Sequence, residues 1–261
     1  MNYFRTELRR AFGWPWVAAV LIIYLPMIVE NLSPLQTMIF TERENSMNIM
    51  VNALYKSSIM QLSLFALACP YTRSFLQDQS SGLIKYQIPR VGRKRYACTR
   101  FAANAISSAS AVLFAQCTFF AFCLICFPYP DIGYHKVIPT GEAMEGLLYG
   151  NPAGYYAVFL LMQIPSTMAW ASLALALSGY VRNQYITLCV PFLVFSLIST
   201  LSRVKIIAPL FDACYFIYYG YYLQSEWVAK LIEYFSFFGL MLVGSFGLFY
   251  RKVIRYDGHT G

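Results

Sequence analysis

The chain has 261 residues, of which 58% are hydrophobic, 18% are aromatic and only 12% are charged; its formal net charge is +8 and its mean hydropathy is +0.51. Because soluble domains carry roughly 25% charged residues, a soluble fold of this size would have too few charges to cover its surface. Uncharged runs at 101–130, 146–181, 183–202 and 234–250 reach or approach the about 20 residues needed to cross a bilayer. The sequence therefore excludes a soluble domain and predicts an all-α integral membrane protein with a single transmembrane domain over residues 1–261.

The N-terminal segment has apolar residues at helical spacing, Phe4, Leu8 and Phe12, with arginines between them. This pattern predicts a short amphipathic helix on the inner membrane surface. A cleaved signal peptide is the alternative, since a basic start precedes an apolar run. Glu7 near the start, Pro26 late in the run and the lack of a small-x-small cleavage site all favour the helix.

Six spans are predicted, with both termini on the same side of the membrane. Their approximate ranges are 12–29, 54–75, 105–127, 155–181, 184–201 and 231–250. The segment 206–225 is apolar enough for a seventh, but a seventh span would place the basic tail opposite the N-terminal arginines. We expect it to be interfacial or re-entrant, because tyrosine favours the membrane–water interface. Its aromatic residues form a possible outer substrate or gate region: Phe211, Tyr215, Tyr218, Tyr219 and Tyr222.

The distribution of charge predicts which side is cytoplasmic. With six spans, the N-terminus, the loop at about 76–100 with Arg73 at its edge, Arg182 and the C-terminal tail together hold 14 of the 20 Lys and Arg but only 3 of the 12 acids. The inner side is then +11 and the outer side −3. By the positive-inside rule both termini are cytoplasmic. Orientation and anionic lipid headgroups account for the basic balance, so no nucleic-acid partner is expected.

Several motifs that would indicate an enzyme are missing from the sequence. There is no phosphate-binding Gly-rich loop with Lys-Ser/Thr and no His-Glu-x-x-His. The two histidines, His135 and His259, fall on opposite sides of the predicted membrane, and Cys123 and Cys126 lie inside the third span. The predicted spans carry no Asp, Glu or His near their centres, where intramembrane enzymes and proton-coupled pumps need them. We expect no catalytic residues, no metal and no cofactor.

The loop between the second and third spans is the most informative stretch. Seven of the 20 cations lie between Arg73 and Arg100, with Asp78 as the single acid. Inside this basic run, 83–88 places Leu83, Ile84, Tyr86 and Ile88 on a short amphipathic element. Pro89 is expected to stop it, and Asp78, Ser80 or Ser81 to cap its start. On these grounds alone the element could dock on a soluble partner or lie on lipid headgroups.

The same loop resembles that of the type-2 ABC transporter permeases. The matching pattern is an acid, a glycine, a short apolar stretch, a Pro-Arg pair and a tyrosine entering the next span, here Asp78, Gly82, Leu83–Ile88, Pro89, Arg90 and Tyr96. The amphipathic N-terminal helix, the six spans and the join at 173–194 resemble that family as well. The family often has Glu where this chain has Asp78 or Gln79.

The resemblance implies a function and a set of partners. The coupling helix that docks on a separate ATP-binding subunit would comprise Asp78, Gly82, Leu83, Ile84, Tyr86, Ile88, Pro89 and Arg90, and the connecting helix would carry Phe4, Leu8 and Phe12. Two permease chains, identical or different, and two ATPase subunits would form an exporter in the cytoplasmic membrane for an amphipathic or lipophilic peptide, antibiotic or lipid. A six-span channel or assembly factor not powered by ATP is the alternative, and an intramembrane enzyme comes third.

Overall fold

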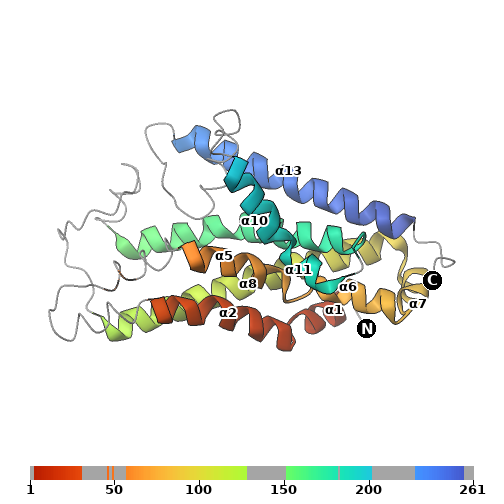
Figure 1. Cartoon of the computed structure of the whole chain (residues 1–261), viewed down its shortest axis with the longest axis horizontal. Helices are drawn as coiled ribbons and strands as arrows, with labels where there is room; N and C mark the ends of the chain where they lie inside the picture. Colours follow the sequence, from red (N-terminus) through yellow and green to blue (C-terminus); the bar gives the residue numbers. More distant parts are fainter. Residues whose placement is uncertain are drawn as a thin grey trace.

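The computed structural model describes residues 3–30, 46, 49, 57–127, 151–181, 183–201 and 227–255, and these residues are α-helical almost throughout. They form an elongated bundle (Figure 1). Its nine described helices are α1 (Tyr3–Ala11), α2 (Trp14–Glu30), α5 (Ser57–Ala68), α6 (Thr72–Ser80), α7 (Ile84–Val91), α8 (Arg93–Cys126), α10 (Pro152–Ser178), α11 (Gln184–Leu201) and α13 (Trp227–Ile254). The predicted all-α class is confirmed.

Three of these helices are long and apolar enough to cross a membrane: Arg93–Cys126, Tyr156–Ser178 and Tyr234–Ile254. A fourth candidate arises if α1 and α2, which meet at an angle of 43°, are taken as one bent span. Helices α11 and α13 lie close to the predicted ranges 184–201 and 231–250. The described part of the chain thus has three or four candidate spans, which is consistent with a multi-pass membrane protein. Six spans are predicted from the sequence, and the length and hydropathy of the described helices do not show that number.

The predicted second span at 54–75 is not one helix. α5 ends at Ala68, a turn follows, and α6 begins at Thr72. Pro70 lies in this turn, and proline cannot donate the backbone hydrogen bond that would continue α5. The break turns α6 into a separate helix that carries Ser74 and Asp78 into the interior.

The stretch predicted as an inter-span loop at about 76–100 is largely helical, and it contains α7 and the first turns of α8. α8 begins at Arg93 rather than near residue 105, and its 34 residues extend about 51 Å at 1.5 Å per residue. The hydrocarbon core is only about 30 Å thick, so one end of α8 must project beyond it. Gly92, with φ of 87°, makes the sharp turn that separates α8 from α7.

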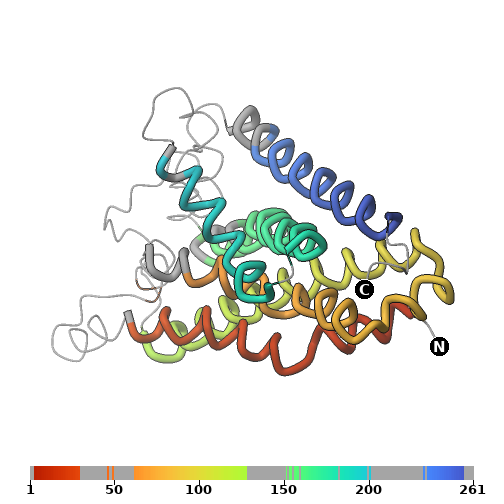
Figure 2. Tube along the Cα trace, turned by 45° about the vertical axis from the view of Figure 1, so that its right-hand side comes forward, coloured from red at the N-terminus to blue at the C-terminus, as the bar shows by residue number. Residues whose placement is uncertain are grey.

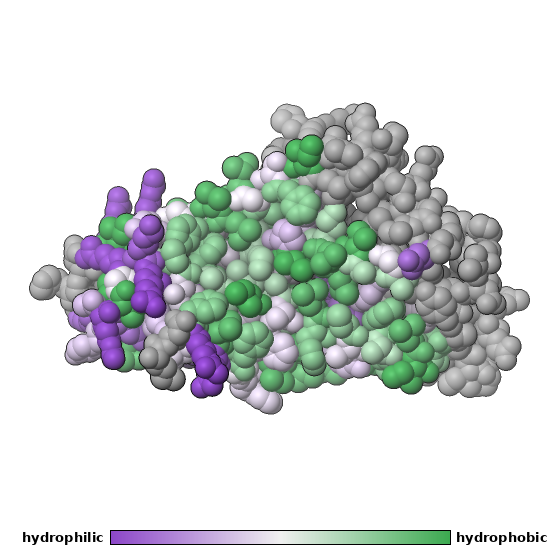
Figure 3. Space-filling view, turned by 180° about the vertical axis from the view of Figure 1, so that it is seen from behind, coloured by the Kyte–Doolittle hydropathy of each residue, from purple (hydrophilic) through white to green (hydrophobic). Residues whose placement is uncertain are grey.

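Polar residues gather at one end of the bundle, named here the charged end. α1, α6, α7, the start of α8 and the last turns of α13 lie there (Figures 1 and 2). Figure 3 shows most of the hydrophilic surface at this end and a largely hydrophobic surface along the rest of the described helices. α2, α8 and α11 begin at or beside the charged end, whereas α6, α10 and α13 end there.

The main core lies in the apolar part of the bundle, between α2, α5, α8, α10, α11 and α13. Its large buried side chains include Trp170, Tyr156, Phe119 and Phe238. A second buried cluster lies at the charged end and joins α6, α7, α8, α10 and α13. This second cluster fixes the position of the short helix α7.

Candidate functional site at the charged end

The short amphipathic element predicted in the basic loop is helix α7. It runs from Ile84 to Val91, so Pro89 lies inside the helix and the prediction that it ends the helix is wrong. The carbonyl that Pro89 leaves without a helical partner belongs to Lys85, an exposed residue, where water can take the place of the missing bond. Gly82 with φ of 72° precedes α7 and Gly92 with φ of 87° follows it, so two left-handed glycines bound the helix.

The predicted side-chain cap of α7 is also absent. The N-cap position is Leu83, which offers no capping oxygen. Asp78, Ser80 and Ser81 lie in or just after α6, and the two serine hydroxyls donate back to the carbonyls of Gln77 and Asp78. The carboxylate of Asp78 is held elsewhere in the structure.

α7 has one buried face and one exposed face. Ile84 and Ile88 are buried in the second core cluster, with Phe75 of α6, Tyr96 of α8 and Phe249 of α13 among the residues around them. On the other side Leu83 is 46% exposed, Tyr86 is 77% exposed, and Pro89 and Arg90 are exposed as well. Of the residues predicted to dock an ATPase, these four lie on an accessible surface, and Gly82 lies beside them at the turn.

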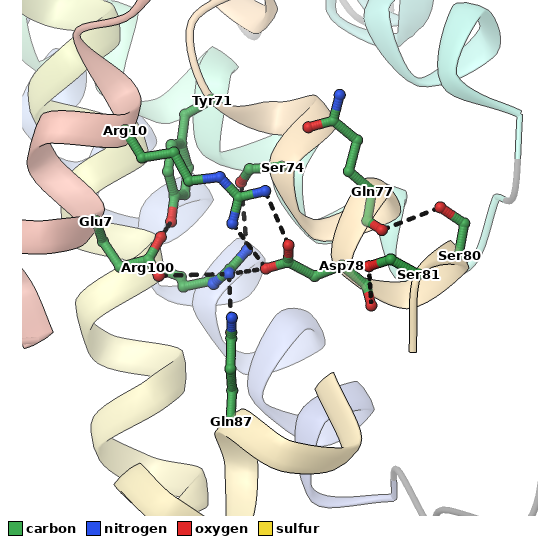
Figure 4. Close-up of polar contacts among 10 residues, drawn as sticks. All are labelled: Glu7, Arg10, Tyr71, Ser74, Gln77, Asp78, Ser80, Ser81, Gln87 and Arg100. Carbon is green, nitrogen blue, oxygen red and sulfur yellow. Dashed lines mark hydrogen bonds and ion pairs between the residues drawn. The ribbon is translucent and has the colours of Figure 1, made fainter. Parts of the chain in front are cut away.

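Asp78 is fully buried, between two arginines from other helices (Figure 4). Arg10 of α1 donates from Nη1 to Oδ2 at 2.9 Å and from Nη2 to Oδ1 at 2.8 Å, which is a two-pronged pair. Arg100 of α8 also donates from Nη2 to Oδ2 of the same carboxylate. Asp78 therefore holds α1, α6 and α8 together, and its side chain does not belong to the exposed face of α7.

A second buried acid, Glu7 of α1, lies on the other side of Arg100. Its Oε1 is 3.5 Å from Nη2 of Arg100, and its Oε2 accepts a hydrogen bond from the hydroxyl of Tyr71. Arg100 also donates to Ser74 Oγ at 3.3 Å and to Gln87 Oε1 at 3.2 Å. The bond to Gln87 brings α7 into the same network.

Aromatic rings enclose Arg100. Its guanidinium carbon lies 4.9 Å from the centroid of the Tyr96 ring and 5.7 Å from that of Tyr71. Such cation–π contacts contribute most where water is excluded, and the Arg100 side chain has no exposed surface. Tyr3 of α1 stacks on Tyr96 with centroids 6.3 Å apart, which closes the cluster on the α1 side.

The charges of this cluster cancel: Glu7 and Asp78 balance Arg10 and Arg100. Buried ions are tolerated only when they are paired and hydrogen-bonded, since desolvation costs several kcal/mol per ion. The bonds to Asp78 raise the pKa of the Arg10 guanidinium, which keeps it charged. We call these four side chains the ion cluster; it joins α1, α6 and α8 directly and α7 through Gln87.

The predicted residues of the connecting helix lie on the outer side of α1, with Phe12 directly after its last residue. Phe4 and Leu8 are half-buried and Phe12 is 42% exposed, whereas the fully buried positions are Glu7 and Ala11. An apolar strip thus remains accessible to lipid. The inward side of α1 carries a charge, which the spacing of apolar residues did not indicate.

A second buried polar group lies deep in the apolar part of the bundle. Gln116 of α8 donates from Nε2 to Oε1 of Gln163 on α10, and the Tyr156 hydroxyl donates to the backbone carbonyl of Gln116 at 2.9 Å. Both glutamine side chains are buried. We call this the amide pair. Among the described residues, no three His, Cys, Asp or Glu side chains come together as a metal site.

Other predicted positions fall outside the described residues. These are the proposed outer gate residues Phe211, Tyr215, Tyr218, Tyr219 and Tyr222, together with both histidines. Sequence reasoning did not identify the roles of Glu7, Arg10, Tyr71 and Arg100. A signal was nevertheless present, because Glu7 and Asp78 are two of the three acids on a side that carries 14 cations.

Comparison with protein-family models, with curated proteins and with solved structures produced no match. The resemblance to the type-2 ABC permeases therefore rests on the sequence pattern alone.

Proposed function

We propose that this chain is the membrane subunit of an ATP-driven exporter of the type-2 ABC class, and that a separate ATP-binding subunit docks on α7. The observation that carries the proposal is the exposed face of α7. Leu83 and Tyr86 present apolar and aromatic surface among the basic residues of the charged end. No described part of the chain covers them, and exposed apolar groups beside charged ones are typical of protein interfaces.

The attachment of α7 suits a helix that transmits movement. Ile84 and Ile88 insert between α6, α8 and α13, and Gln87 bonds to Arg100 of the ion cluster. A displacement of α7 by a partner would therefore act on several long helices and, through Arg100 and Asp78, on α1. Packed cores of this kind pass on small displacements instead of absorbing them.

We further propose six passes, with α2, the α5–α6 pair, α8, α10, α11 and α13 as the spans. The alternation of helix directions at the charged end supports this proposal (Figure 1). The many cations at that end (Figure 3) support a cytoplasmic position for it, by the positive-inside rule. One six-span chain forms half of a pathway in this class, so the working unit would contain two permease chains and two ATPases. ATP hydrolysis would take place on the partner, and the substrate would be an amphipathic or lipophilic molecule leaving the cell.

Co-purification from the native membrane tests the proposal. The tagged chain is extracted in mild detergent, co-purifying proteins are identified by mass spectrometry, and vanadate-sensitive ATP hydrolysis is measured. We expect an ATP-binding subunit at a one-to-one ratio with this chain. Leu83→Asp should weaken its association by about tenfold or more, because a charge would be buried in an apolar contact.

Ile254→Asp is the matched control, since Ile254 is also apolar and exposed (37%) and belongs to the last turn of α13 at the same end. This variant should retain the ATP-binding subunit. If the wild-type chain captures no such subunit, or if Leu83→Asp and Ile254→Asp behave alike, the coupling role of α7 is refuted and the channel or assembly-factor alternative takes its place.

A further inference from the structure

A pocket of about 410 Å³ lies at the charged end, between α1 on one side and α7 with the start of α8 on the other. Thr6 and Tyr3 of α1 line it, together with Tyr86, Gln87 and Arg90 of α7 and Arg95 of α8. Its volume falls within the about 300–1,000 Å³ typical of small-molecule sites. The pocket is separate from the ion cluster, whose four charged side chains do not line it.

The described lining of the pocket is positively charged and includes no acid. Arg90 and Arg95 are its two ionised residues, and neither has an ion pair or hydrogen bond with a described residue. The neighbouring acids, Glu7 and Asp78, are already neutralised within the ion cluster. Nothing in the described chain balances Arg90 and Arg95, so both guanidinium groups are available to an anion.

The polar groups around these arginines suit a phosphate. Arginine presents a planar fork of N–H donors that matches phosphate oxygens. The hydroxyls of Thr6 and Tyr86 add neutral donors at the wall. Gln87 gives its carbonyl oxygen to Arg100, which leaves its amide nitrogen as a donor. Several donors and no carboxylate therefore surround one space.

We propose that this pocket binds the phosphate group of an anionic phospholipid headgroup from the inner leaflet. A lipid is favoured over a soluble phosphate because α1 leads directly into lipid-facing surface. Trp14 is 76% exposed, and tryptophan concentrates at the headgroup level. Trp14 and Thr6 are only eight positions apart, which is at most about 12 Å of helix. A headgroup in the pocket could thus keep its acyl chains beside α2.

This site does not depend on the proposed exporter function, since it requires no ATPase. It shares Tyr86 and Arg90 with the exposed face of α7, whereas Leu83 lies outside the pocket. Leu83→Asp therefore tests docking, and variants of Arg90 with Arg95 test the anion site, so the two proposals can fail separately.

The test is native mass spectrometry of the full-length chain in detergent, titrated with phosphatidylglycerol or with zwitterionic phosphatidylcholine. We expect one tightly bound phosphatidylglycerol per chain and no comparable phosphatidylcholine adduct. Arg90→Gln with Arg95→Gln should weaken the phosphatidylglycerol adduct by about 10- to 30-fold, because each cation near anionic lipid is worth about a factor of 5 to 6. Thr6→Leu, which fills the pocket without changing charge, should weaken it as well.

The matched control is Arg5→Gln with Arg9→Gln. It also removes two positive charges, but from exposed positions of α1 outside the pocket. It should weaken the adduct no more than a few-fold. Equal loss in both double variants, or no loss in the Arg90/Arg95 pair or in Thr6→Leu, would overturn the site. If inorganic phosphate at the same concentration displaces phosphatidylglycerol from the chain, the lipid assignment is wrong. It is also wrong if the Arg90/Arg95 double variant changes the binding of an acidic protein partner but not that of phosphatidylglycerol.

Discussion

Two of the buried polar groups in the described helices differ in charge and in depth. The ion cluster of Glu7, Arg10, Asp78 and Arg100 lies at the charged end, whereas the amide pair of Gln116 and Gln163 lies between α8 and α10 in the apolar part of the bundle. The first joins helices through full charges and the second through a neutral hydrogen bond. Each lies in surroundings that offset the desolvation free energy of its polar side chains.

The difference shows how the cost of desolvation distributes polar residues along a membrane bundle. A charge near the bilayer centre is far more costly than an amide, and it has no water nearby if its partner moves away. At the charged end Arg10 is still 35% exposed, so water meets the edge of the ion cluster. The ion cluster can therefore be strong and specific, whereas the amide pair is limited to a modest contribution. The following variants test this contrast.

The largest effect is expected from Asp78→Asn. It removes the shared partner of Arg10 and Arg100 and leaves two positive charges beside Glu7 alone. Loss of one partner of a buried pair typically costs about 3–5 kcal/mol of the free energy of unfolding. The measurement is thermal unfolding in detergent, followed by tryptophan fluorescence.

The control for Asp78→Asn is Arg73→Gln, an exposed change that loses one bond to Gln184 and should shift stability by less than about 0.5 kcal/mol. The double change Asp78→Leu with Arg100→Met removes both partners of this pair, but it leaves Arg10 without Asp78 and Glu7 without Arg100, so it should recover only part of the loss. If Asp78→Asn unfolds at the same temperature as Arg73→Gln, the ion cluster does not hold the charged end together.

Tyr71→Phe should have an intermediate effect. It removes the hydroxyl that donates to Glu7 Oε2 and keeps the ring against Arg100. A hydrogen bond to a charged group contributes about 1.5–3 kcal/mol, so we expect a loss of that size in the same unfolding experiment. Tyr180→Phe removes an exposed bond to the carbonyl of Leu248 and serves as the comparison; equal losses would contradict the argument.

Gln163→Leu tests the deeper group and should cost about 1 kcal/mol, as interhelical hydrogen bonds in membranes usually do. The double variant Gln116→Leu with Gln163→Leu leaves neither side chain unsatisfied and should return close to the wild-type stability. The coupling energy from this double-mutant cycle is the quantity to measure. A coupling as large as that of Asp78 with Arg100 would remove the contrast between the two regions.

The smallest effect is expected from Arg10→Gln. Arg10 is partly exposed, and Asp78 keeps its bond to Arg100, so the loss should be about 0.2–1 kcal/mol. Added salt should reduce the difference between Arg10→Gln and the wild type, because a partly exposed pair is screened. If Arg10→Gln lowers the free energy of unfolding as much as Asp78→Asn does, Arg10, and not Arg100, is the main partner that stabilises Asp78.

The local features of the fold could be read from the sequence. Long uncharged runs predicted helices that the structure has at 184–201 and 227–254, and the spacing of Ile84 and Ile88 predicted an amphipathic element at α7. These features depend on hydropathy and periodicity, which a short window of residues carries in full. The boundaries around Pro70 and Pro89 were less predictable, because proline can break a helix or lie within one according to its surroundings.

What the tertiary structure decided was the partner of each polar side chain. Glu7 and Arg100 are 93 positions apart, and no pattern in the chain relates them; only the packing of α1 against α8 brings them together. The same packing turned Asp78 away from the exposed face of α7 and left Arg90 and Arg95 without an acid among the described residues. The sequence alone determined that the chain belongs in a membrane and which end is basic, because those properties are sums over residues. Which charges are neutralised and which remain free depends on distances between helices, and these exist only in the folded chain.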